Sequence, residues 1–316
     1  MATQTDQQLG SRAFAAPDRI LLATDLADID YLVPYAIAQC QVSEASLLIA
    51  HVVQAVETAP LDAAAVLAAD AVATEHAAKE VLDGVCAKVR AAGVPCEIAL
   101  RRGRPAEVIP ELVHSARAER LVLGTHGRRN LKRFFLGSAA HEILRRVEVP
   151  VWTVGPHARP FSQGAPSRIL HPVSLSSGYR ETARLALALA QFYEAEVTLL
   201  HVLPRDVHAR SISEHLVQWT TFELGRLIPD EAPLWTTATI LVEAGEVVPQ
   251  ILKMADKISA DLIVMGSNPD TSFWPGPGDN TVYNVIAEAG CPVLTLRHSL
   301  KAQSKAEPAS QTRVAG

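Results

Sequence analysis

The 316-residue chain contains few aromatic residues and few cysteines. Aromatic residues make up 5% of the chain, whereas small and β-branched aliphatic residues are abundant. This composition favours a buried parallel sheet flanked by helices over an antiparallel sandwich. No two cysteines form a Cys-x-x-Cys pair, and none has a histidine at metal-ligand spacing. We therefore expect buried, inert thiols in a reducing compartment, at Cys40, Cys86, Cys96 and Cys291.

The chain also lacks an excess of positive charge and a long apolar run. Its formal net charge is −5, which gives no reason to expect nucleic acid or an anionic membrane as the main partner. No run approaches the ~20 apolar residues that a membrane-spanning helix needs. Residues 1–17 are polar and Ala-rich without a basic start, so we expect a cytoplasmic protein.

Two halves of the chain repeat each other. The repeated segments are 19–25 with 168–174, 45–52 with 195–202, 120–124 with 261–266, and 149–154 with 291–296. A chain of this length exceeds what one core usually supports, and two long units indicate a duplication rather than a solenoid. A segment with three prolines, 156–167, separates the halves. We predict domains at 18–156 and 167–298, a linker at 157–166, and flexible tails at 1–17 and 299–316.

Strand-like and helix-like patterns alternate within each half. In the first half, short β-branched runs occur at 20–23, 46–53, 121–123 and 151–154. Ala-rich helical stretches separate them, at 61–92, at 105–117, and from 137 to about 147. Alternation of this kind predicts an α/β fold made of two tandem, doubly wound parallel sheets of Rossmann-like type.

The most informative segment of the first half is a glycine pattern. It reads Gly124-x-x-Gly127, nine residues, then Gly137-Ser138. Gly124 ends a predicted strand at the carboxyl edge, where open parallel sheets bind ligands, and Gly127 lets the backbone turn back. Gly137 allows a ligand to approach closely, and we predict that Ser138 caps the following helix. The amides at that helix start would form a cradle for phosphate.

The nine-residue loop inside this pattern carries four cations and no acid: Arg128, Arg129, Lys132 and Arg133. In a chain of net negative charge, a local basic excess beside an anion cradle favours a phosphate ligand. The alternative is a solvated loop with a structural glycine turn and an ordinary helix cap.

The pattern resembles the nucleotide motif of the universal stress protein family, in its ATP-binding branch. Further segments are similar to family features: the first strand ending at Asp25, the second strand ending in His51-Val52, the sequence Gly103-Arg-Pro-Ala-Glu107 before a helix, and the last strand after Pro150. The resemblance implies the adenine nucleotide α-hydrolase-like variant of the fold.

The resemblance also implies a site. Asp25 would contact the adenine together with Ala23, Thr24 and the backbone of Val52. Ribose and phosphates would lie against Leu123, Gly124, His126, Gly127, Arg128, Gly137, Ser138 and Ala139. ATP is the expected ligand, with ADP, AMP and an accompanying Mg²⁺ left open. For Asp25 the alternative is a cap on the helix that follows.

The second half departs from the pattern. Pro269 and Asp279 stand where the first half has Gly127 and Gly137, Asn280 replaces Ser138, and Ser174 replaces Asp25. An aspartate in a phosphate cradle repels the ligand, and the loop 270–278 has no cation. We therefore expect no nucleotide site there. The pair Phe273-Trp274 either packs on its own domain or forms a contact surface.

We expect the two halves to form an intramolecular pseudo-dimer. The last strands, 151–154 and 293–296, can pair with each other and cover two exposed sheet edges. A homodimer of the whole chain stays open. Because His51 and His201 are repeated, we assign them a role in the fold rather than in chemistry.

The sequence offers no catalytic signature. It contains no Gly-x-Ser-x-Gly elbow, no Walker A motif and no Gly-x-Gly-x-x-Gly after the first strand. We therefore expect a nucleotide-binding regulatory protein of the stress response rather than an enzyme. The alternatives are a nucleotide-independent interaction protein and, third, a slow ATPase or related nucleotide-acting enzyme.

Overall fold

The computed structural model of the protein describes residues 15–54, 64–125, 136–155, 158–159, 161, 164–175, 178–203, 214–267 and 279–297, with 64–71 and 279–280 described by backbone alone. The strands are β1 (Arg19–Ala23), β2 (Ser46–Val53), β3 (Cys96–Arg102), β4 (Arg120–Gly124), β5 (Val151–Val154), β6 (Arg168–Pro172), β7 (Glu196–Leu203), β8 (Ala238–Ala244), β9 (Leu262–Ser267) and β10 (Val293–Arg297). The helices are α2 (Ile29–Ser43), α3 (Ala64–Ala91), α4 (Pro105–Ser115), α5 (Ser138–Arg146), α6 (Tyr179–Tyr193), α7 (Glu214–Gly225), α8 (Val247–Lys257) and α9 (Asp279–Glu288), with a short 3₁₀ helix η1 (Ala232–Leu234).

The predicted elements of the first half are present with small shifts at their ends. The helix expected over 105–117 ends earlier, at Ser115, because Arg117 takes the left-handed conformation at φ 52° and stops the helix. The helix expected over 61–92 is observed as α3, with 61–63 outside the described residues. The fold class predicted from the alternating pattern is confirmed.

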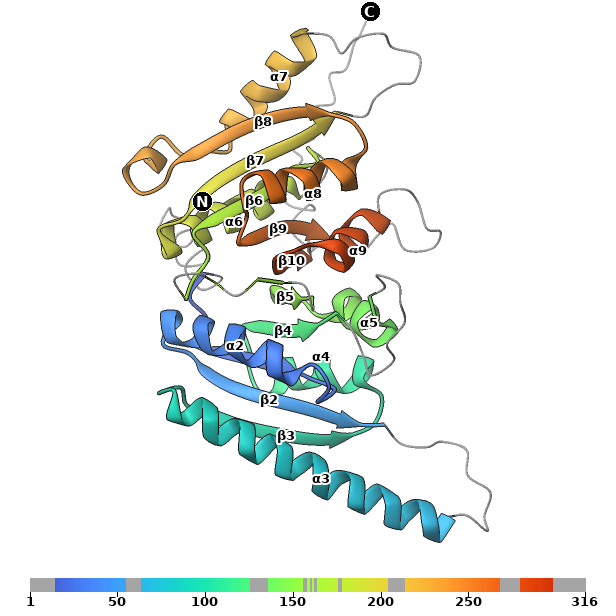
Figure 1. Cartoon of the computed structure of the whole chain (residues 1–316). Helices are drawn as coiled ribbons and strands as arrows, with labels where there is room; N and C mark the ends of the chain where they lie inside the picture. The colour runs from blue at the N-terminus through green and yellow to red at the C-terminus, as the bar shows by residue number, and fades with distance from the viewer. Residues whose placement is uncertain are drawn as a thin grey trace, which may run out of the picture.

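All ten strands join in one sheet (Figure 1), in the order β3-β2-β1-β4-β5-β10-β9-β6-β7-β8. Neighbouring strands within each half run parallel. In the first half the chain builds outward from β1 to β3 and then returns to the other side of β1 with β4. The carboxyl ends of β1 and β4 therefore flank the point where the direction of winding reverses, which is where ligands bind in such sheets.

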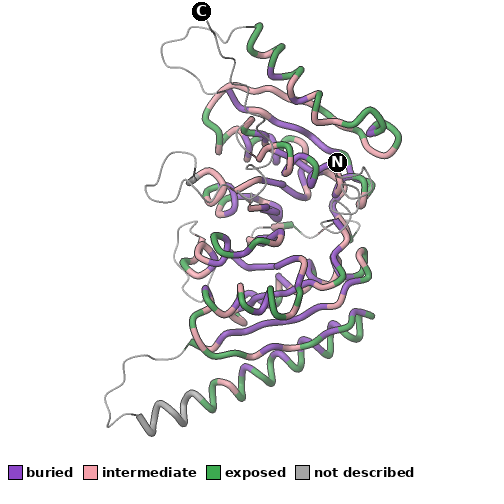
Figure 2. Tube along the Cα trace, turned by 180° about the vertical axis from the view of Figure 1, so that it is seen from behind, coloured by how far each residue is buried: buried purple, intermediate pink, exposed green. Residues whose placement is uncertain are grey.

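Helices cover both faces of the sheet, and each face has one continuous core. Leu32 of α2, Leu82 of α3, Leu185 of α6 and Leu224 of α7 belong to one buried cluster. A second cluster contains residues of α4, α5, α8 and α9, among them Ile109, Ile143, Ile251 and Val285. Both faces of the central strands are covered (Figure 2), which agrees with the buried parallel sheet flanked by helices that the composition predicts.

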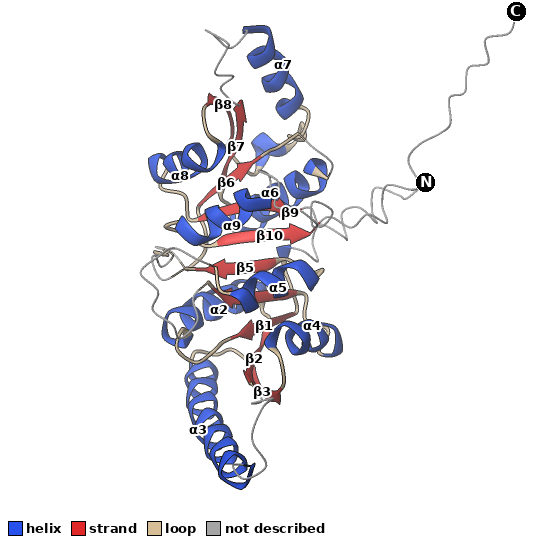
Figure 3. Ribbon diagram, turned by 90° about the vertical axis from the view of Figure 1, so that its right-hand side faces the viewer, coloured by secondary structure: helices blue, strands red, loops and turns tan. Residues whose placement is uncertain are grey.

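The two halves meet at β5 and β10, which pair antiparallel (Figure 3). Leu294 lies opposite Trp152, and the hydroxyl of Thr153 donates to the carbonyl of Val293 over 2.9 Å. Both strands are almost completely buried, so neither edge is open to another chain. The strand pairing expected from the sequence is therefore present.

A buried arginine also joins the halves. Arg120 is fully buried, and its guanidinium donates to Gln39 Oε1 at 3.0 Å and to the hydroxyl of Tyr193 on α6 at 3.3 Å. It also donates to the carbonyl of Ala15 at 3.1 Å and lies 5.6 Å from the centre of the Trp152 ring. One side chain thereby links the N-terminal segment, the first half and the second half.

The cysteines are buried, and the segment between the halves packs against the first half. All four cysteines are buried and free, as predicted, and burial raises the pKa of Cys40 and of Cys291 to about 12. Within the segment predicted as a linker, Phe161 packs edge-on against Tyr35 and Trp152, at centroid distances of 5.1 and 5.9 Å. Among the described residues, no helix is both long and apolar enough to cross a membrane.

Candidate functional site

The backbone turns sharply where β1 ends. Thr24 donates its amide to Ala50 of β2, and Leu26 takes a left-handed conformation at φ 72°. Leu175 occupies the equivalent position after β6 and is also left-handed, at φ 54°. Positive φ is uncommon for leucine, and its repetition shows that both halves build the same turn at the carboxyl edge.

A histidine holds this turn in each half. Nδ1 of His51 lies 2.9 Å from the carbonyl oxygen of Thr24, and Nδ1 of His201 lies 2.6 Å from that of Val173. A carbonyl only accepts, so Nδ1 carries the proton in both rings. The role in the fold that the sequence predicts for these two histidines is confirmed.

Asp25, the predicted adenine contact, is partly exposed after β1. Its Oδ1 accepts the amide of Ala27 over 2.9 Å, which closes a small side-chain turn. The alternative assignment, a cap on the following helix, is wrong, because α2 begins at Ile29 and its N-cap residue is Asp28. The second carboxylate oxygen of Asp25 takes part in no hydrogen bond within the described residues.

Sequence reasoning missed the buried carboxyl group of Asp28. Its side chain is 5% exposed and lies directly against Gly124, where a Cβ would come within 2.0 Å of Asp28 Oδ2. The hydroxyl of Thr24 donates to Asp28 Oδ1 over 2.5 Å, and the same Thr24 oxygen accepts the amide of Leu26. Burial raises the pKa of Asp28 to about 7, with a smaller contribution from the neighbouring charge of Asp25. The packing of Asp28 therefore requires glycine at position 124.

A signal for Asp28 was present in the sequence. Asp28, Leu32, Tyr35 and Ala36 follow the spacing of one helix face, and all four are buried. A carboxylate at the first position of an apolar helix face points inward, so its periodicity could have marked it as a buried acid.

A backbone hydrogen bond between Gly137 and Thr125 joins the two ends of the glycine loop. Thr125 follows β4, and its carbonyl accepts the amide of Gly137 over 3.1 Å. This hydrogen bond places the start of α5 beside the end of β4. The first helical hydrogen bond of α5 runs from the amide of His141 to the carbonyl of Gly137, so the amides of residues 138–140 have no acceptor inside the helix.

The cap of α5 differs from the sequence prediction. The N-cap residue is Gly137, with φ −58° and ψ 145°, and Ser138 is the first helical residue. The prediction that Ser138 caps the helix is therefore wrong, because the extended backbone that an N-cap needs occurs one residue earlier. Gly137 has no side chain to accept from the first-turn amides. Among the described residues, a Cβ on Gly137 would meet only the Thr125 carbonyl, at 3.9 Å.

A cavity of about 420 Å³ opens beside the start of α5. It is lined by Gln54 after β2, by the turn between β3 and α4, and by the first turns of α5: Gln54, Gly103, Arg104, Pro105, Ala106, Ser138, Ala139 and Glu142. Its volume lies in the range typical of small-molecule sites. The N-termini of both α4 and α5 border it, and both bring partial positive charge.

The structure brings only some of the predicted site residues to this cavity. Ser138 and Ala139 line it, whereas the other described site residues do not. Of these, Asp25 and Gly137 are partly exposed, and the rest are buried: Ala23, Thr24, Val52, Leu123 and Gly124. His126, Gly127 and Arg128 lie outside the described residues, as do the other cations of the loop. Sequence reasoning did not identify Gln54, Arg104 and Glu142 as wall residues, because they come from three separate elements.

The second half keeps the backbone of the site but not its acid. Gly103 and Gly245 are equivalent, take φ 135° and 154°, and donate to the ends of β2 and β7. Ser174 occupies the place of Asp25 in the retained turn. Asp279 and Asn280 begin α9, with side chains outside the described residues, and Pro269 and the Phe273-Trp274 pair also lie outside them. Within the described part of the chain, no group of three or more His, Cys, Asp or Glu residues could hold a metal ion.

Comparison with known families identifies the repeated unit. The model of the universal stress protein family matches residues 17–155 and again residues 166–297. The chain belongs to the universal stress protein family. It is a tandem member, since each half matches the family model separately.

Solved structures support this fold assignment for the tandem universal stress protein. A universal stress protein from Archaeoglobus fulgidus DSM 4304 superposes with a TM-score of 0.67 at 19% identity, covering 90% of this chain and 97% of that one. A candidate universal stress protein from Pseudomonas aeruginosa UCBPP-PA14 gives a TM-score of 0.58 at 17% identity, with 91% and 95% covered. At these identities the similarity shows the fold alone. No curated protein matches the sequence.

Proposed function

We propose that the first half of this universal stress protein binds ATP or a related adenine nucleotide, and that occupancy of this site regulates contact with a partner. The observation that carries the proposal is the start of α5. Its first-turn amides have no acceptor in the helix, its N-cap is a glycine, and a cavity of about 420 Å³ opens directly beside it. An anionic group is the ligand that such a helix start favours.

The residues around the cavity fit a nucleotide. Ser138 and Ala139 can hold phosphate through their amides, and Ser138 adds a hydroxyl donor. Glu142 also lines the cavity, and its carboxylate suits a donor such as a ribose hydroxyl rather than a phosphate. The four cations of residues 128–133 lie between Thr125 and Gly137 in the sequence. They would add charge-assisted contacts to the phosphates.

A purely structural role does not account for Gly137, the third glycine of the pattern. Gly137 has an ordinary negative φ, and a Cβ there would meet no described atom closer than 3.9 Å. Neither backbone conformation nor packing within the described residues requires glycine at this position. Close approach of a ligand to the helix start would explain the absence of a side chain.

We propose that the second half supports the first instead of binding nucleotide. Ser174 replaces the acid that would recognise adenine, and Asp279 replaces the glycine at the helix start. The second half covers the edge of β5 and contributes Tyr193 to the Arg120 cluster. No catalytic turnover is part of the proposal, since neither half provides a recognised nucleophile with its base.

The test is to identify what the protein carries when it is purified without added nucleotide. The protein is denatured, and released small molecules are identified by chromatography and mass spectrometry. We expect ATP or ADP near one equivalent per chain. The Gly137→Asp variant, which copies the second half, should release none, because an aspartate at the N-cap both repels phosphate and accepts the first-turn amides itself.

Gly137→Ala is the matched control. It adds a Cβ in the same open space without adding charge, so it should lose far less ligand than Gly137→Asp. An aspartate is a favoured N-cap residue, so Gly137→Asp should stay folded, with the melting temperature of the nucleotide-free wild type. A wild-type protein that carries no nucleotide, and whose melting temperature is unchanged by millimolar ATP, would support the nucleotide-independent interaction protein instead.

A further inference from the structure

The two halves are related by an approximate two-fold axis at the β5–β10 pair. Pro150 and Pro292 are equivalent in the sequence, so Trp152 of β5 corresponds to Leu294 of β10. These two residues lie directly opposite each other in the antiparallel pair. Equivalent residues face each other where a two-fold axis passes, so the axis crosses the sheet at this point.

The same axis brings one helix of each half together, and Figure 1 shows α5 and α9 as neighbours at the junction of the halves. α5 begins at Ser138 beside the cavity, and α9 begins at Asp279. Between them, the ring of His141 lies 4.2 Å from the ring of Tyr283, centre to centre, with 42° between the planes. Since Gly137 corresponds to Asp279, His141 corresponds to Tyr283. Two equivalent positions, one in each half, are therefore in direct contact.

His141 is joined to the part of α5 that borders the cavity. Its amide donates to the carbonyl of Gly137 over 2.9 Å, which is the first helical hydrogen bond of α5. Ser138 and Ala139, which line the cavity, lie between these two residues in the sequence. A shift of His141 therefore moves the backbone amides at the helix start.

Packing has to hold α5 in place, because the helix has nine residues and helices of this length are marginal in water on their own. Ile143 and Leu144 anchor its later turns in the core. In the first turn Ala140 is buried, but it offers a single methyl group for packing. The contact between the rings of His141 and Tyr283 is larger, and its second partner comes from the other half of the chain.

We propose that Tyr283 of the second half, acting through His141, positions the first turn of α5 for the phosphates of the nucleotide. This proposal rests on the proposed function, since it concerns the same site. Tyr283 is not among the residues that line the cavity, so its role is positioning rather than contact with the ligand. With the ring contact in place, the first-turn amides are held in one orientation before the nucleotide arrives, and less free energy is lost in ordering them.

The coupling also acts from the nucleotide site toward the second half. A contact that strengthens nucleotide binding is itself strengthened when nucleotide binds, because the coupling free energy is reciprocal. Occupancy of the first half should therefore order α9 through Tyr283. Hydrogen exchange of the amides of residues 282–288 should slow when ATP is added, which gives a route by which occupancy reaches the other half.

The experiment is a double-mutant cycle in which isothermal titration measures the affinity of the nucleotide-free, full-length protein for ATP. Tyr283→Ala and His141→Ala should each weaken binding about 3- to 10-fold, the range expected for one aromatic contact. The double variant should bind no more weakly than either single variant, since both substitutions remove the same contact. Tyr283→Phe keeps the ring and should restore most of the affinity.

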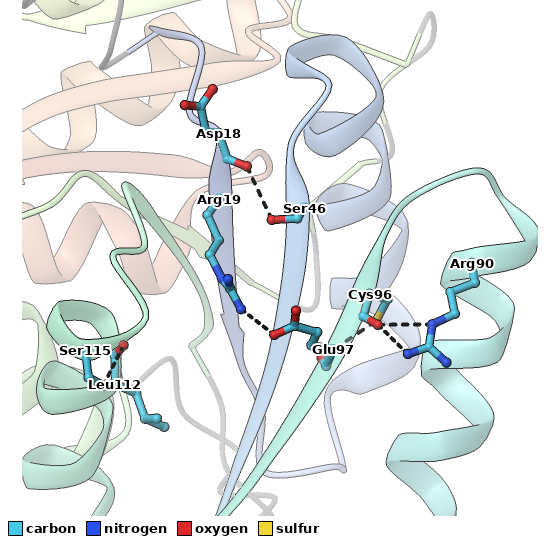
Figure 4. A network of polar contacts seen from close by, with 8 residues as sticks. All are labelled: Asp18, Arg19, Ser46, Arg90, Cys96, Glu97, Leu112 and Ser115. Atoms are coloured by element: carbon cyan, nitrogen blue, oxygen red, sulfur yellow. Dashed lines mark hydrogen bonds and ion pairs between the residues drawn. The ribbon is translucent and has the colours of Figure 1, made fainter.

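A remote contact provides the matched control. Arg19 and Glu97 form an ion pair at 2.5 Å near the amino ends of β1 and β3, at the edge of the sheet opposite the cavity (Figure 4). Glu97→Gln should leave the affinity for ATP unchanged. In the nucleotide-free protein, Tyr283→Ala should speed hydrogen exchange of the amides of residues 141–146, whereas Glu97→Gln should not. Circular dichroism shows that each variant is folded.

The outcomes separate this proposal from the proposed function. If the wild type binds ATP and Tyr283→Ala binds it equally tightly, the positioning role is wrong while the nucleotide site stands. Losses that add in the double variant also overturn the positioning role, because His141 and Tyr283 would then act separately. A wild type that binds no ATP overturns the proposed function itself, and the positioning role with it.

Discussion

Replacing Asp28 with asparagine should stabilise the protein at neutral and alkaline pH. The carboxyl group is buried beside Gly124, and burial raises its pKa from 3.8 to about 7. Asparagine keeps the size of the side chain, and its carbonyl can still accept the Thr24 hydroxyl. Its amide would also give a donor to the hydroxyl of Tyr31, which is buried without a hydrogen-bond partner.

The magnitude follows from the linkage between protonation and folding. Each unit of pKa shift is worth about 1.4 kcal/mol, so a shift from 3.8 to about 7 corresponds to about 4 kcal/mol. Because the folded-state pKa is raised, the folded protein holds a proton that the unfolded chain has already released. This contribution is present in full below pH 3.8, declines as the pH rises, and is lost above about pH 7.

The assay is urea unfolding of the wild type and of Asp28→Asn between pH 5 and 8. At pH 8 the variant should be more stable by about 2–4 kcal/mol, and the difference should shrink toward pH 5. Asp30→Asn is the control, because Asp30 is exposed in the same first turn of α2 and its replacement changes the net charge equally. If both variants show the same small effect at every pH, the buried acid does not titrate as described.

Two further substitutions test contacts of the fold, one beside the candidate site and one in the second half. Gly124→Ala places a Cβ 2.0 Å from Asp28 Oδ2, so it should cost about 1–3 kcal/mol of stability; an unchanged melting temperature would contradict the packing described. Asp261→Ala removes the carboxylate oxygen that accepts from the amide and hydroxyl of Ser167 and from the amide of Arg168, at 3.1, 2.7 and 3.0 Å. It should cost about 2–4 kcal/mol in urea unfolding, and a loss near zero would show that these hydrogen bonds add little.

Much of the fold could be predicted because the two halves repeat and their strands are short and β-branched. β2 and β5 have the predicted ends, and the pairing of β5 with β10 followed from the need to cover two edges. Helix ends were less accurate. The left-handed conformation of Arg117, which ends α4, has no signature such as glycine at that position.

The site could be predicted less completely, because its walls come from distant parts of the chain. Gln54 follows β2, Arg104 precedes α4 and Glu142 lies on α5, and only the folded sheet brings them to one cavity. Ser138 was assigned as the cap because serine is a common N-cap residue, yet the backbone begins the helix one residue earlier. The helix-face spacing of Asp28 could have marked it as buried, but its contact with Gly124 appears only in the folded structure.

The central claim is that the first half alone holds a nucleotide. Isothermal titration of nucleotide-free protein with ATP and Mg²⁺ tests it most directly, with Gly137→Asp and Gly137→Ala titrated in parallel. We predict one site per chain, lost in Gly137→Asp and retained in Gly137→Ala. Two sites per chain would contradict the silent second half, and no binding by the wild type would contradict the nucleotide site itself.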